Sequence, residues 1–178
     1  MIAASVADWI EYDEGLVLTP TQGPGGHWNI GYGHNLSANG LPSAIVHAMD
    51  PSQDQPLSPV DAIPFLNERG FTVALAESLL GIDIADVRRW LIPVFWSWPA
   101  QGSPRQAALV NMGYNLGPTT FGEFTTFIEL VNRSSWTAAA ADLRGTLVFR
   151  ELSSRYSRIA DTIETGQWPD LPDSSDAA

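Results

Sequence analysis

A short strand-forming stretch stands between one helix and a long remainder that is patterned for helices only. After Glu14, the run "LVLTPTQGPGGHWNIGY" mixes β-formers with a Gly/Pro cluster, which predicts two short strands joined by a turn. From Ile84 onward the apolar spacing is helical, and each segment runs into a Gly, Pro or capping residue. The chain is therefore expected to be α+β, with a small β-hairpin lobe and a larger helical lobe.

Capping residues predict where the helices begin. A capping pattern at Ser5 predicts a first helix that ends at Gly15. A second one at Ser58 predicts a long helix, Pro59 to Leu80, that joins the two lobes. Pro64 lies inside this helix and removes a backbone donor, so we expect a kink or a break near it.

The length of 178 residues, 44% of them hydrophobic, is enough for one domain with a sizeable core. We expect a single domain over residues 1–168, with a polar, Pro-rich and mobile tail at 169–178. Within the domain, the expected parts are a sheet-containing lobe at about 13–57, a connecting helix at about 58–80, and a helical lobe at about 81–168 together with 1–12.

Composition excludes several classes of function. The chain has no cysteine, so disulfides and thiolate chemistry are excluded. The net charge of −11 argues against nucleic acid and anionic lipid as partners. Six of the basic residues lie in the second half and leave a local positive surface open there: Arg105, Arg133, Arg144, Arg150, Arg155 and Arg158. No signal peptide and no membrane-spanning stretch is expected, so we expect a soluble monomer made in the cytoplasm.

Glu14 is the first candidate for chemistry. It stands at a predicted helix end, where the helix dipole favours the protonated carboxyl that a general acid requires. The alternative is a surface acid beside Asp13. No Asp or Glu occurs from Gly15 to Met49, although the chain is strongly acidic. No second carboxylate is therefore available in the hairpin region.

The segment "DEGLVLTPTQGPGGHWNIGYGHNL" resembles the active-site segment of phage-type lysozymes, the endolysins that cut bacterial peptidoglycan. The segment "SPVDAIPFLNERGFTVALAESLLG" is similar to the interlobe helix of that family, and "SPRQAALVNMGYNLG" to its buried central helix. "FTTFIELVNRSSWTAAAADL" and "SSRYSRIADTIETGQW" resemble its closing helices. The resemblance extends over residues 5–168 and implies a lysozyme-like fold and a muramidase activity without a cofactor.

The resemblance also implies roles for single residues. Glu14 matches the catalytic acid that protonates the glycosidic oxygen. The partner positions, Asp and Thr in the family, are Gly23 and Asn29 in this chain. Asn115 matches a polar amide that lines the cleft, and Arg155 matches an arginine that pairs with the catalytic acid; the alternatives are a helix-surface asparagine and a free surface arginine.

Three mechanisms remain open because the family's Asp is replaced by Gly23. In hydrolysis, Asn29 orients the water and His27 acts as the base, unless His27 is only a solvated turn residue. In lytic transglycosylation, Glu14 is the only catalytic group that is needed, and the 6-hydroxyl of the sugar replaces water as the nucleophile. In the third case, catalysis is weak or lost and the chain is a peptidoglycan-binding or virion structural module.

The remaining motifs have structural interpretations. Gly31 and Gly33 are expected to allow close packing of strand on helix, and His34 to be a hydrogen-bonded structural residue, so no metal site is expected. The run "FWSWP", Phe95 to Pro99, offers either a stacking surface for sugars or core packing. The expected setting is a phage or prophage endolysin that acts on the wall in the periplasm or after lysis.

Overall fold

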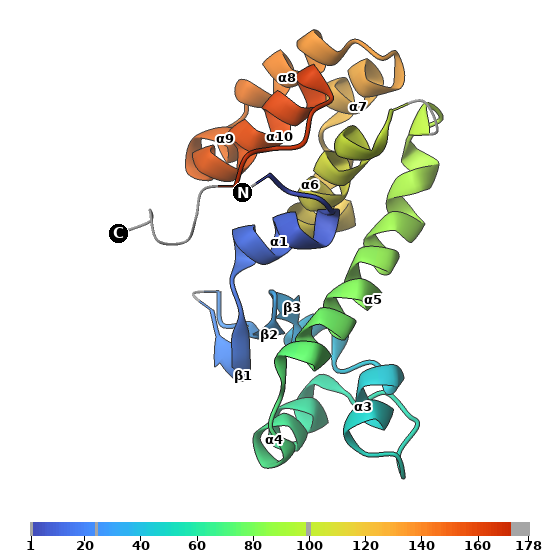
Figure 1. The fold of residues 1–178 in the computed structure, drawn as a ribbon, viewed down its shortest axis with the longest axis vertical. Helices are drawn as coiled ribbons and strands as arrows, with labels where there is room; N and C mark the ends of the chain where they lie inside the picture. The colour runs from blue at the N-terminus through green and yellow to red at the C-terminus, as the bar shows by residue number, and fades with distance from the viewer. Residues whose placement is uncertain (1, 24, 99–100, 172–178) are drawn as a thin grey trace. The chain divides into compact units, whose positions relative to one another are not determined.

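The computed structural model describes residues 2–23, 25–98 and 101–171 and divides into two compact units. The sheet unit is Glu14–Asp83, and the helical unit is Met1–Asp13 with Ile84–Ala178. Helices and one small antiparallel sheet make up the described elements, so the expected α+β class is confirmed (Figure 1).

The sheet unit contains a three-stranded sheet in the order β1-β2-β3, where two strands were expected. The strands are β1 (Val17–Gln22), β2 (Trp28–Gly31) and β3 (His34–Asn35). The helices of this unit are α2 (Leu36–Asn39), α3 (Ser43–Met49), α4 (Pro59–Arg69) and the first part of α5 (Val73–Leu91). Strand β3 has only two residues, too few to show an alternating pattern in the sequence.

The expected single helix over 58–80 is wrong, because two helices occupy this region. The break falls at Gly70, whose φ of 76° ends α4, and not at Pro64, which lies inside α4. The donor that Pro64 lacks would have bonded the carbonyl of Val60 in the first turn. Val60 is 80% exposed, so water can satisfy that carbonyl. Helix α5 then continues to Leu91, well beyond the expected end.

The helical unit begins with α1 (Val6–Glu14), whose last residue belongs to the sheet unit. The amide of Asp8 donates to Ser5 Oγ at 3.1 Å, and the amide of Ala4 donates to Asp8 Oδ2 at 3.1 Å, so the expected cap is present. The other elements are η1 (Ile92–Val94), α6 (Ser103–Gly122), α7 (Thr125–Asn132), α8 (Trp136–Arg144), α9 (Leu147–Glu151) and α10 (Ser153–Thr165).

Helix α10 packs against α6, α8 and α9, and together they form the body of this unit (Figure 1). Large side chains that are fully buried fill its core: Trp9, Phe95, Phe121, Phe127 and Tyr156. Helix α6 is interrupted at Gly117, where φ is 70° and ψ is 170°, and Pro118 follows. Its first part therefore ends where the sequence predicted.

The expected mobile tail is wrong for residues 169–171. The amide of Ala3 donates to the carbonyl of Pro169 at 3.1 Å, and Ile2 pairs with Asp170 in an antiparallel bridge. Leu171 is only 3% exposed. Backbone pairing and one apolar side chain therefore hold this segment to the helical unit, while 172–178 lie outside the described residues.

Candidate active site

Glu14 ends α1, and Gly15, with φ at 71°, turns the chain into the hairpin. The Glu14 side chain is half-buried. Its carboxyl lies against the backbone of Gly33, in the turn between β2 and β3: a Cβ on Gly33 would lie 3.0 Å from Glu14 Oε2. The structure therefore places the predicted general acid, Glu14, beside a glycine backbone that has no side chain.

Gly23 and Asn29, the two positions where the family pattern differs, are neighbours in the hairpin. A Cβ on Gly23 would lie 3.3 Å from Asn29 Nδ2. Asn29 is paired with Thr21 across the strands, and its amide nitrogen donates to the carbonyl of His27 at 3.4 Å. The His27 side chain is exposed. The structure thus brings Gly23, His27 and Asn29 together at one end of the hairpin, where none of them supplies a carboxylate.

His34 is a buried structural residue. Its Nδ1 lies 2.9 Å from both carboxylate oxygens of Asp83, and its Nε2 lies 2.9 Å from the carbonyl oxygen of Gly40. Both ring nitrogens are therefore engaged with protein acceptors. Over the described ranges, no group of three or more His, Asp or Glu residues has an arrangement that could hold a metal ion.

A buried polar network in the helical unit was not found from the sequence. Asp13 has a side chain only 1% exposed; it accepts from Asn111 Nδ2 at 3.0 Å and pairs with Arg158. Arg155 Nε donates to Asn111 Oδ1 at 2.8 Å and lies 3.5 Å from Asp13 Oδ2. The available signal was Asn111 itself, an amide within the apolar run "AALVNM" of a helix.

Of the two predicted site residues on the helices of the helical unit, Arg155 belongs to this network and Asn115 lies near it on α6. Arg155 contacts Asn111 and Asp13, and its predicted pairing with Glu14 stays a prediction. Asn115 lies on the same helix as Asn111, four residues later, and its Oδ1 accepts from the hydroxyl of Tyr156 at 3.0 Å. The Asn115 side chain is half-buried.

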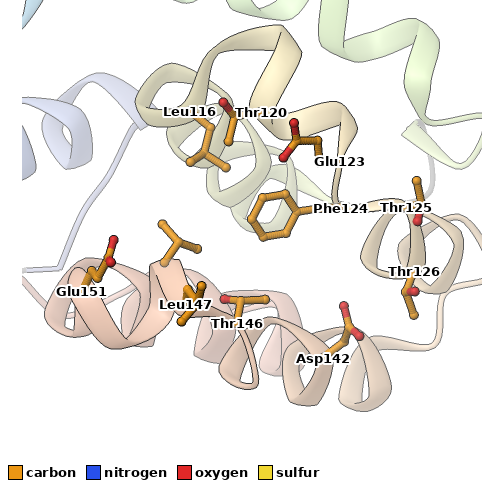
Figure 2. Close-up of a pocket in the computed structure, with 11 residues that line it drawn as sticks. Leu116, Thr120, Glu123, Phe124, Thr125, Thr126, Asp142, Thr146, Leu147 and Glu151 are labelled. Carbon is orange, nitrogen blue, oxygen red and sulfur yellow. The ribbon is translucent and has the colours of Figure 1, made fainter.

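The helical unit also contains a cavity of about 610 Å³, which none of the predicted site residues lines. Figure 2 shows Phe124 at its centre, with acidic side chains of different helices around it. The side-chain carboxylates of Glu123, Asp142 and Glu151 have no hydrogen bond or ion pair with another described residue. The cavity is therefore acidic around an apolar centre.

Four of the six arginines of the second half pair with acids, and two of these, Arg155 and Arg158, contact Asp13. Arg133 pairs with Glu129, and Arg144 pairs with Asp161 and Glu164. These contacts hold the pKa of Arg144 above its ordinary value, chiefly through the hydrogen bond to Asp161. The positive charges of this half are thus largely compensated by acids.

The aromatic run separates into two environments. Phe95 is 2% exposed and packs edge-on against Phe121, with ring centroids 6.1 Å apart. Trp96 is 74% exposed, and Trp98 is half-buried. The prediction of core packing is therefore confirmed for Phe95, whereas Trp96 lies on the surface. Pro99 lies outside the described residues.

Comparison with known proteins places these residues in a family. The model of the phage lysozyme family matches residues 11–146, which include Glu14 and the hairpin. The chain belongs to the phage lysozyme family. It is 23% identical over 175 residues to a probable T4-type lysozyme 1 of Dictyostelium discoideum, with 93% of this chain and 96% of that protein covered.

Two further relatives are similar. A probable T4-type lysozyme 2 of the same organism is 24% identical over 174 residues, with 93% and 96% covered. The pre-baseplate central spike protein Gp5 of Enterobacteria phage T4 is 26% identical over 167 residues, which cover 91% of this chain and 28% of that protein. Membership makes the chain a lysozyme-like peptidoglycan hydrolase by family, with peptidoglycan as the family's substrate. None of the helices among the described residues has the length and apolar character to span a membrane.

Proposed function

We propose that this phage lysozyme family member is a muramidase that cleaves the bond between N-acetylmuramic acid and N-acetylglucosamine, with Glu14 as the general acid. The observation that carries the proposal is the family match across Glu14, at a helix end, together with the hairpin that follows it. In this role the Glu14 carboxyl donates its proton to the glycosidic oxygen as the bond breaks.

Hydrolysis then needs a group that activates water on the other side of the sugar ring. Gly23 has no side chain for this task. Asn29 orients the water through its amide in this proposal, and the exposed imidazole of His27 accepts the proton. The contact of Asn29 Nδ2 with the His27 carbonyl, at 3.4 Å, is long enough to be exchanged for one with water.

Lytic transglycosylation is the second candidate, and the hairpin favours it specifically. Gly23 and Asn29 are neighbours, and no acid occurs from Gly15 to Met49. In this reaction Glu14 first protonates the leaving oxygen, and its carboxylate then takes the proton of the sugar 6-hydroxyl. Oxygen 6 bonds to carbon 1, and an anhydro ring closes without water.

A binding module is the third candidate. The relative from phage T4 is named as a central spike protein, and this chain matches about a quarter of its length. As a binding module, this chain would hold glycan without cutting it. In the first two candidates we place the chain in a phage or prophage as an endolysin, acting as a monomer on the wall in the periplasm or after lysis, without nucleic acid and without membrane insertion.

Mass spectrometry of fragments released from purified peptidoglycan tests these proposals. Wild type is compared with Glu14→Gln, and Glu77→Gln, at an exposed position of α5, is the matched control. Fragments from wild type and control but not from Glu14→Gln support the role of Glu14. Reducing ends then indicate hydrolysis, and anhydro ends indicate transglycosylation. If wild type binds peptidoglycan but releases no fragments, only the third candidate, the binding module, remains.

A further inference from the structure

Gly33 has a stricter requirement for glycine than its backbone conformation alone explains. Its φ is 88°, a region that L side chains rarely adopt. A Cβ at this position would also lie 3.0 Å from Oε2, 3.3 Å from Cδ and 3.6 Å from Cγ of Glu14. A methyl group would therefore collide with the carboxyl itself.

Other glycines of the sheet unit show that a positive φ and a close contact at the Cβ position are separate requirements. Gly70 has a φ of 76°, yet a Cβ there would meet nothing within 4 Å. Gly31 has a φ of 65°, and its Cβ would make only an ordinary contact of 3.6 Å with Ala76. Among these three glycines, only Gly33 stands against a group with proposed chemistry.

The backbone of Gly33 is fixed on both sides. Tyr32 is 8% exposed and His34 is 4% exposed. The His34 ring is bound to Asp83 and to the carbonyl of Gly40. The Glu14 carboxyl, in contrast, is the far end of a flexible side chain. An added methyl group would therefore displace the carboxyl and not the turn.

We propose that Gly33 is a positioning residue for Glu14: its bare Cα sets the place of the carboxyl and leaves the carboxyl close to the backbone. This inference rests on the proposed function, because the position matters when Glu14 must reach the glycosidic oxygen. Proton transfer requires a separation of about 2.6–3.2 Å between heavy atoms, so the place of the carboxyl decides whether it reaches the glycosidic oxygen. The displacement changes the reacting geometry of one carboxyl, so we expect it to affect kcat more than KM.

The test compares Gly33→Ala with Gly70→Ala on purified peptidoglycan. Gly70→Ala brings a similar φ strain without the collision. We expect Gly33→Ala to lower kcat at least about tenfold with KM changed less than about twofold, and to alter the pH profile of kcat/KM, while Gly70→Ala retains kcat. Equal kcat values for the two variants would overturn the inference.

A stability measurement keeps the inference testable if Gly33→Ala folds poorly or if wild type has no activity. Glu14→Ala removes the group with which the methyl group collides. Gly33→Ala should therefore lower the unfolding midpoint more in the wild-type background than in the Glu14→Ala background. A Gly70→Ala substitution should lower the midpoint equally in both. An inactive wild type with this coupling present contradicts only the proposed function, whereas an active wild type without the coupling contradicts the role of Gly33.

Discussion

The ion pair between His34 and Asp83 offers a sharp test of what stabilises the sheet unit. Nδ1 of His34 lies 2.9 Å from both oxygens of Asp83, and the two side chains are 3% and 13% exposed. Nε2 lies 2.9 Å from the Gly40 carbonyl. A neutral imidazole has one N–H, whereas two acceptors face this ring. The imidazolium satisfies both acceptors, with the carboxylate of Asp83 as its counter-charge.

Asp83→Asn keeps the shape and one acceptor oxygen but removes this counter-charge. Breaking one side of a buried ion pair costs about 3–5 kcal/mol. We expect the lower end, ~3 kcal/mol, because the asparagine oxygen can still accept one hydrogen bond. For a chain of this length the midpoint of thermal unfolding should fall by about 6–12 °C.

Asp86→Asn is the matched control on the same helix, since Asp86 pairs with Arg89 while both side chains are largely exposed, at 55% and 76%. An exposed pair of this kind contributes up to about 0.5 kcal/mol. Thermal and urea unfolding of the two variants at neutral pH measures the difference. Equal losses of stability for both variants would refute the reasoning that burial makes the His34–Asp83 pair important.

Three further outcomes are expected. The pKa of Asp50 is lowered from 3.8, chiefly by the hydrogen bond from the Ser52 hydroxyl and then by that from Gln53, so its contribution to stability is present above that value and lost as pH falls. Asp50→Asn should therefore lower the urea midpoint at neutral pH and lower it less in strong acid; an equal loss at both would contradict this. Gly23→Asp should raise the release of reducing ends at least about tenfold, because its carboxylate can activate water once the flexible amide of Asn29, 3.3 Å from the added Cβ, has shifted slightly; no rise would exclude the hairpin end as the place of water activation. Because the chain carries a net charge of −11, its rate on the anionic wall should rise with moderate salt, and a steep fall would contradict repulsion as the limiting factor.

Local sequence signals predicted the elements that depend on neighbouring residues. The cap at Ser5 and the stop at Gly15 were right, because both act through bonds within one turn of helix. The helix break was placed at Pro64 and occurred at Gly70. Propensity alone assigns the larger cost to Pro64. The carbonyl that lacks its donor lies in an exposed turn, where water can satisfy it, and the sequence does not show this exposure.

The candidate site, too, contains residues that the sequence identified and contacts that only the structure shows. Glu14 and the changed positions Gly23 and Asn29 were identified through the resemblance to phage-type lysozymes, and the family match over residues 11–146 includes all three. The Asp13–Asn111 contact joins residues 98 positions apart, and no local pattern indicates such a pairing. The same holds for Leu171, whose burial depends on a bridge between the two ends of the described chain.

The sequence by itself therefore determined the class of fold, through the periodicity of its segments, and the family, through the order of its motifs; it also proposed Glu14 as the acid. Only the tertiary structure decided which polar groups are buried together, that Pro64 does not end its helix, and that Gly33 lies against the Glu14 carboxyl. Each of these depends on burial and on contacts between segments far apart in the chain, and such contacts form only when the core packs.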